Sequence, residues 1–144
     1  MKLRIDNEAM LGDFFCNTRL LGIMAPIEQY RFCWHLNQIL NFDFRINNDI
    51  EIRLKKNLRN YFFSIYEYGE NSGTVKHYLY NNKDEGEYLL PEFKHLDFLW
   101  LMKDDIMSEK DLNIFINSIK VIPSVQLVLE LTNEKIRNKQ HLVF

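Results

Sequence analysis

An uninterrupted run of apolar residues at 98–102 constrains the fold more than any other feature of the sequence. A short run of this kind is typical of a strand that is buried on both faces of a sheet. We therefore expect a central strand at 97–102. The rest of the chain has to supply the strands and helices around it.

Alternation of apolar and polar residues predicts further strands. Residues 50–55 alternate between apolar and charged side chains, which is the period of a half-buried strand, and a polar turn at 47–49 precedes them. Two segments rich in β-branched and aromatic residues, 60–68 and 74–80, flank turn-forming residues and predict a hairpin. The remaining predicted strands are 14–24, 87–90 and 125–131.

Two segments have helical periodicity, one at 27–40 and one that follows Ser108. Ser108 is a suitable N-cap for the second helix, whose apolar residues recur at intervals of three and four. The polar residues of the first helix form one narrow stripe, so apolar surface covers most of its circumference. Such a helix needs cover on more than one side, from other elements or from a partner subunit. The candidate interface residues are Ile27, Tyr30 and Trp34.

The predicted elements follow the order β-α-β-β-β-β-β-α-β. This order favours an α+β fold in which two helices pack on a largely antiparallel sheet. The 144 residues contain few glycines and prolines and no linker-like stretch. We therefore predict a single α+β domain over 1–132, followed at 133–144 by a polar C-terminal tail that ends in a short apolar segment.

Charge and hydropathy argue against several classes of partner. The net charge of −2 provides no long-range attraction to nucleic acid, and the basic residues near 53–59 are expected to lie in water. Residues 1–8 lack the apolar core of a signal peptide, and charged residues interrupt every apolar stretch before membrane-spanning length. Only two cysteines are present, which suits a cytoplasmic protein with reduced thiols.

The standard catalytic and cofactor motifs are missing from the sequence. It contains no G-x-S-x-G nucleophile elbow, no phosphate-binding loop and no standard zinc or calcium pattern. Cys33 and His35, with Cys16 earlier in the chain, are the nearest approach to a metal site. Residues two apart on a helix point about 200° away from each other, so we expect no metal there and no cofactor.

Glu92, His95 and Asp97 form a second cluster of polar residues, in the predicted loop before the central strand. Carboxylates at such a position accept hydrogen bonds from backbone amides and fix the loop, which is a structural role. The catalytic alternative places Arg31, Glu92 and Asp97 around a pocket between the first helix and the sheet. Both interpretations stay open at this point.

The same loop carries a resemblance to a known family. Pro91, Glu92 and Asp97 have the spacing of the motif that names the IPExxxVDY family of small bacterial proteins, and the segment 90–98 resembles it. The resemblance implies a shared fold but no assigned activity, substrate or cofactor. Physically, Pro91 ends one strand and the two carboxylates bracket a stiff crossover, which is either structural or a recognition loop.

Some positions depart from this motif. Leu90, Leu96 and Phe98 stand for its Ile, Val and Tyr, so apolar character is kept but Phe98 lacks the hydroxyl. The stretch 21–26, together with 30–37, is similar to the same family. With the similar order of elements, the resemblance extends over most of the chain.

Two functional hypotheses follow from these observations. The first is a non-enzymatic, self-associating domain that forms a homodimer, because the first helix is apolar almost all round and the aromatic strands have two apolar faces. The alternative is a small-molecule-binding or catalytic domain that uses the pocket between the first helix and the sheet.

Overall fold

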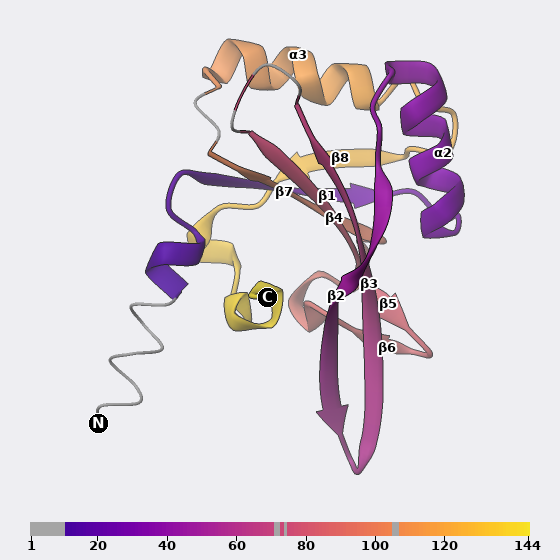
Figure 1. Ribbon diagram of the computed structural model, residues 1–144, viewed down its shortest axis with the longest axis vertical. Coiled ribbons are helices and arrows are strands. Elements are labelled where there is room, and N and C mark those ends of the chain that lie inside the picture. Colours follow the sequence, from indigo (N-terminus) through magenta and orange to yellow (C-terminus); the bar gives the residue numbers. More distant parts are fainter. Residues whose placement is uncertain (1–10, 71–72, 74, 105–106) are drawn as a thin grey trace.

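The computed structural model describes residues 11–70, 73, 75–104 and 107–144. Its main feature is a six-stranded sheet with the order β2-β3-β4-β7-β1-β8, in which every described pairing is antiparallel (Figure 1). The predicted α+β class is confirmed, and the order of elements roughly follows the prediction. Residues 1–8, for which we predicted no signal peptide, and Thr74, which we placed in a strand, lie outside the described residues.

The helices and strands have the following bounds. The sheet strands are β1 (Thr18–Met24), β2 (Arg45–Lys56), β3 (Arg59–Gly69), β4 (Lys76–Asn81), β7 (Phe98–Lys103) and β8 (Leu127–Glu130). The α-helices are α2 (Gln29–Leu40) and α3 (Glu109–Ile119), and residues 11–14 are also helical. The short elements are β5 (Lys83–Asp84), β6 (Glu87–Tyr88), η1 (Pro91–Phe93), η2 (Asn133–Lys135) and η3 (Lys139–Leu142).

The predicted central strand is β7. It pairs with β4 on one side and β1 on the other, and its residues 98–102 are buried. Continuous burial explains why the run shows no alternation between polar and apolar residues, since both faces meet the core. β1 and β4, which are distant in sequence, therefore lie on opposite sides of β7 in the sheet.

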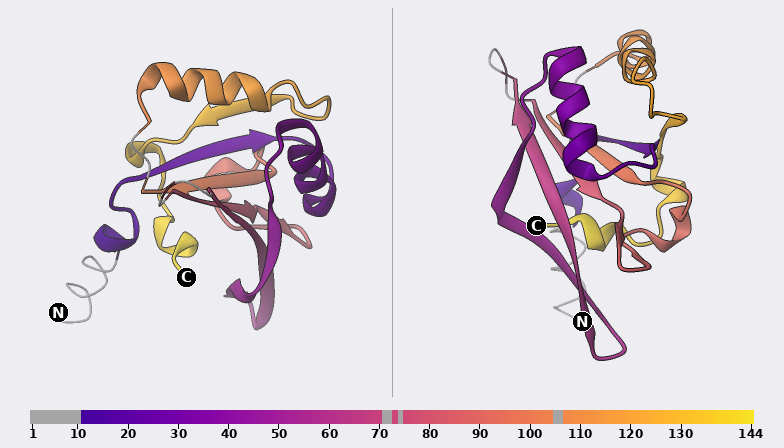
Figure 2. Two further views of the ribbon diagram at one scale, coloured as in Figure 1. Left: turned by 45° about the horizontal axis from the view of Figure 1, so that its top comes forward. Right: turned by 90° about the vertical axis from the view of Figure 1, so that its right-hand side faces the viewer.

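Both α-helices cover one face of the sheet (Figures 1 and 2). Phe32 and Leu36 of α2 pack with Trp100 of β7 in a buried cluster that also includes residues of α3. The side chain of Gln29 fixes the start of α2, because its Nε2 donates to the backbone oxygens of Ser64 (3.0 Å) and Leu79 (2.9 Å). The N-cap predicted for the second helix is confirmed by the bond from the Asp111 amide to Ser108 Oγ.

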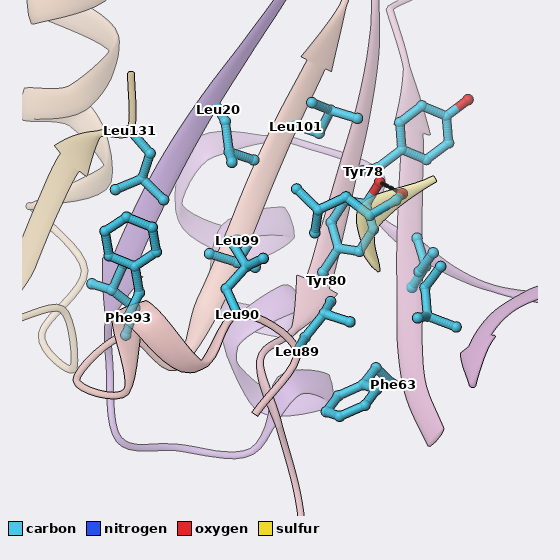
Figure 3. Close-up of a cluster of buried hydrophobic side chains, with 14 of the residues drawn as sticks. Leu20, Phe63, Tyr78, Tyr80, Leu89, Leu90, Phe93, Leu99, Leu101 and Leu131 are labelled. Atoms are coloured by element: carbon cyan, nitrogen blue, oxygen red, sulfur yellow. Dashed lines mark hydrogen bonds between the residues drawn. The ribbon is translucent and has the colours of Figure 1, made fainter. Parts of the chain in front are cut away.

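The second face of the sheet is covered by irregular segments (Figure 3). Leu99, Leu101, Tyr78 and Tyr80 project from β7 and β4 to this side and form a second buried cluster. Residues 82–97 and 133–144 pack on it. The segment 133–144, which we predicted to be a polar tail that ends in a short apolar segment, contributes to the core through the fully buried Leu142.

The first strand is shorter than predicted. Residues 11–14 are helical, and β1 begins only at Thr18 instead of at Phe14. Phe14 is apolar because it is buried in the cluster on the second face of the sheet, which we call the second-face cluster. Asn17, which has a left-handed backbone (φ 53°), separates the helical turn from the strand.

Two other local predictions need correction. The polar residues 47–49 do not form a turn before the strand, because they lie within β2, where the register with β3 shifts between Ile46 and Glu51. The predicted strand at 87–90 is reduced to β6, which pairs with β5 and not with the main sheet. Leu89 and Leu90 turn into the second-face core instead.

Candidate functional site

Asp97 joins three segments at the entry to β7. Its Oδ2 accepts a hydrogen bond of 2.8 Å from the backbone N–H of Ala25, and its Oδ1 accepts one of 2.9 Å from Lys83 Nζ. Its own N–H donates to the backbone oxygen of Ile23 at 2.8 Å. The hydrogen bond to the Asp97 carboxylate raises the pKa of Lys83 above its usual value, against the opposing effect of burial. Asp97 therefore orders the loop that leads from β1 to α2.

The side chain of Asn82 holds together the loop that connects β4 to β7, residues 82–97. Its Nδ2 donates to the backbone oxygens of Phe93 (3.0 Å) and Leu96 (2.8 Å), and its Oδ1 accepts from the N–H of Leu90 (2.9 Å). The side chain is fully buried and all these groups belong to the loop. Residue 82 lies in the polar run 81–86, and nothing in the local sequence pattern distinguishes it from its neighbour Asn81.

Glu92 binds the C-terminal segment. Its Oε2 accepts from the N–H groups of Arg137 (2.5 Å) and Asn138 (2.8 Å), and its Oε1 accepts from Asn138 Nδ2 (2.9 Å). Burial alone would raise the pKa of Glu92, but the hydrogen bonds from Asn138, Arg137 and its own backbone lower it overall. Pro91 opens the η1 turn that presents this carboxylate.

A pocket of about 620 Å³ lies where the start of α2 meets β7. Arg31 and Asp97 line it together with Lys83, whose side chain is about half exposed and whose Nζ bonds Asp97. Glu92 does not line this pocket, because it faces the C-terminal segment. The structure thus brings together two of the three polar residues that the pocket hypothesis combined. The third is held by amide donors elsewhere.

The outer face of α2 carries two exposed aromatic side chains one turn apart. Tyr30 is 61% exposed and Trp34 is 58% exposed. With Arg31 and His35 they line a shallow apolar hollow of about 270 Å³. Ile27, the third candidate interface residue, is half-buried and packs against the core beneath the helix. Tyr30 and Trp34 are therefore the exposed members of the candidate interface.

The cysteine and histidine residues of this region are dispersed. Cys33 is buried on the inner side of α2, where burial raises the pKa of its thiol, and Cys16 is exposed. No group of three or more His, Cys, Asp or Glu side chains within the described residues is arranged to hold a metal ion. None of the helices in the described part of the chain is long and apolar enough to span a bilayer.

Comparison with known proteins gave no match, either to a protein-family model or to a curated protein sequence.

Proposed function

We propose that this chain is a non-enzymatic domain that associates with a second copy of itself through the outer face of α2. The observation that carries the proposal is the exposure of Tyr30 and Trp34 beside each other on that face. Large aromatic side chains are enriched in the buried centres of protein interfaces, and exposing two of them on one helix costs solubility without a partner.

The spacing of these residues suits a twofold axis. When two copies of α2 lie antiparallel across such an axis, a residue and its neighbour one turn later exchange positions. Tyr30 of one copy then faces Trp34 of the other, and the same pair forms twice. The two-sided aromatic strands no longer support the proposal, since both faces of the sheet are covered within the chain.

Light scattering coupled to size exclusion tests self-association at tens of micromolar protein. We expect a dimer for the unaltered chain and a monomer for Trp34→Glu. Ile114→Glu on α3 is the matched control, because Ile114 is 59% exposed on another helix and its replacement should leave the dimer intact. A monomer for the unaltered chain would contradict the proposal.

A second candidate function is the binding of a small molecule in the pocket at the start of α2. Its volume of about 620 Å³ lies in the range of small-molecule sites, and Arg31, Lys83 and Asp97 supply polar contacts. This proposal is one of binding and not of catalysis, because amide donors occupy the Glu92 carboxylate.

A thermal-shift screen of small polar compounds tests the pocket. A compound that binds there should raise the melting temperature of the unaltered chain but not that of Arg31→Ala. Arg53→Ala, which removes an exposed cation on β2, should respond like the unaltered chain. Equal responses of the two variants would place the binding elsewhere.

We also propose membership of the IPExxxVDY family and a cytoplasmic location. The first is supported by Pro91, Glu92 and Asp97 at the spacing of the motif. The second is supported by Cys16 and Cys33, which are both free thiols and form no disulfide.

A further inference from the structure

Residues 133–144, which we call the C-terminal strap, cross the second face of the sheet. The last sheet hydrogen bond before the strap runs from the Leu131 N–H to the backbone oxygen of Leu20, at 2.8 Å. Beyond it, the described backbone hydrogen bonds of the strap are local, as from His141 to Asn138 (3.0 Å) and from Lys135 to Thr132 (3.0 Å). The strap therefore packs on the sheet without extending it.

Side chains supply the hydrogen bonds that hold the strap. Glu92 accepts from Arg137 and Asn138 near its beginning. Near its end, the hydroxyl of Tyr80 donates to the backbone oxygen of Leu142 at 2.7 Å, and His141 Nδ1 lies 2.7 Å from the backbone oxygen of Leu89. These contacts cluster at two points, one at each end of the strap.

An apolar anchor sits at the second of these points. Leu142 is fully buried in the second-face cluster. Tyr78 and Tyr80 belong to the same cluster (Figure 3). The ring of Phe144 lies 4.9 Å from that of Tyr78 and 5.2 Å from that of Phe14, measured between ring centroids. The strap thus contacts the core through the fully buried Leu142, the partly buried Ile136 and Val143, and the ring of Phe144.

We propose that the C-terminal strap opens and closes as a unit while the six-stranded sheet stays folded. Opening breaks the Glu92 and Tyr80 contacts and exposes Leu142, but it leaves the strand pairings untouched. The groove that opening uncovers also binds the same segment as a separate peptide, because none of the contacts described above requires the covalent link at residue 132. This inference does not depend on association through α2.

Hydrogen exchange of the unaltered chain tests the first part of this proposal. The amides of Arg137, Asn138 and His141 are expected to exchange at least about 100-fold faster than those of β7, because segments that open locally do so at lower free energy than the whole domain. Their exchange should also respond only weakly to low concentrations of denaturant. Exchange of the strap and β7 at the same rate, with the same denaturant dependence, would overturn the proposal.

A peptide with the sequence of 133–144 tests the second part. In the full-length variant Leu142→Asp the strap loses its anchor, and we expect the chain to keep its sheet but to melt at a lower temperature. Added peptide should restore the melting temperature by several degrees in a concentration-dependent manner. The same peptide with Leu142→Asp is the control and should have no effect.

Two results would contradict the proposal at this stage. One is loss of the β-sheet circular dichroism signal in both Leu142→Asp and the milder Leu142→Ala, because a separable strap leaves the sheet folded. The other is a folded variant whose melting temperature the unaltered peptide fails to raise at any concentration up to about ten millimolar, because a short segment with one buried anchor is expected to bind with a dissociation constant of about a millimolar.

Discussion

The indole Nε1 of Trp100 donates a hydrogen bond of 3.0 Å to Nδ1 of His77, and both side chains are buried between the sheet and the α-helices. The indole group can only donate, so His77 Nδ1 must be the acceptor and the ring proton must lie on Nε2. That nitrogen lies 3.1 Å from Oε1 of Glu70. One donor on β7 therefore selects the tautomer of a histidine on β4.

Replacement of Trp100 by Phe tests this arrangement. The variant keeps an aromatic ring but leaves Nδ1 of His77 without the indole donor, which should lower the free energy of unfolding by about 1–3 kcal/mol, in addition to lost packing. Urea unfolding followed by circular dichroism measures the change. The matched control is Trp34→Phe on the exposed face of α2, and an equal effect of both replacements would contradict the prediction.

The Glu92 carboxylate should make stability depend on pH. Because the folded state lowers the pKa of Glu92, its contribution is fully present above the usual glutamate pKa and is lost as the pH falls through the lower folded value. We expect Glu92→Gln to reduce the free energy of unfolding by roughly 1–2 kcal/mol at pH 7, since solvent partly screens the group. This difference should shrink below about pH 4.5, the usual value of the group.

Chemical unfolding of both proteins between pH 3 and pH 7 provides the measurement. Glu51→Gln is the control, because Glu51 is exposed on β2. A deficit of Glu92→Gln that stays constant down to pH 3 would show that the ionised carboxylate is not what holds the strap.

The absence of a side chain at Gly22 leaves space for Leu96, which lies in the loop before β7. A Cβ atom at this position of β1 would lie 2.3 Å from Leu96 Cδ1, and Leu96 is fully buried. We expect Gly22→Ala to cost about 1–3 kcal/mol in the free energy of unfolding, as for other overpacked core positions. The double variant Gly22→Ala/Leu96→Ala should lose less free energy of unfolding than the sum of the losses of the two single variants.

A second glycine provides the control for this prediction. Gly12 lies in the helical turn at 11–14, and a Cβ there would meet nothing within 4 Å. Gly12→Ala should therefore be neutral or stabilise by about 0.5–1 kcal/mol. Similar melting temperatures for Gly12→Ala and Gly22→Ala would refute the steric argument.

Asn82 should be more important for stability than its position between two strands, β4 and β5, indicates. Asn82→Ala removes the partners of three backbone groups, which belong to Leu90, Phe93 and Leu96. At about 1 kcal/mol for each, we expect a loss of about 3 kcal/mol. Asn81→Ala is the neighbouring control, since within the described residues its Oδ1 accepts one long bond, of 3.4 Å from the backbone N–H of Lys83, and the two variants should differ clearly in urea unfolding.

The candidate sites were predictable to different degrees. The exposure of Tyr30 and Trp34 follows from a helix with more apolar surface than one sheet covers. The acceptor role of Glu92 and Asp97 follows from carboxylates in a loop. The sequence does not predict which groups donate to these carboxylates, because Asn138 is 46 positions from Glu92 and the Ala25 amide is 72 positions from Asp97.

Local chemistry in the sequence by itself determined the α+β class, the two helices and the buried centre of the sheet. Periodicity, caps and turn residues act over a few positions, so a single segment displays them. Tertiary structure alone decided that β7 lies between β4 and β1, and that residues 133–144 cover the second face instead of trailing as a tail. Those outcomes depend on which apolar surfaces remain uncovered once the sheet has formed, and no single segment carries that information.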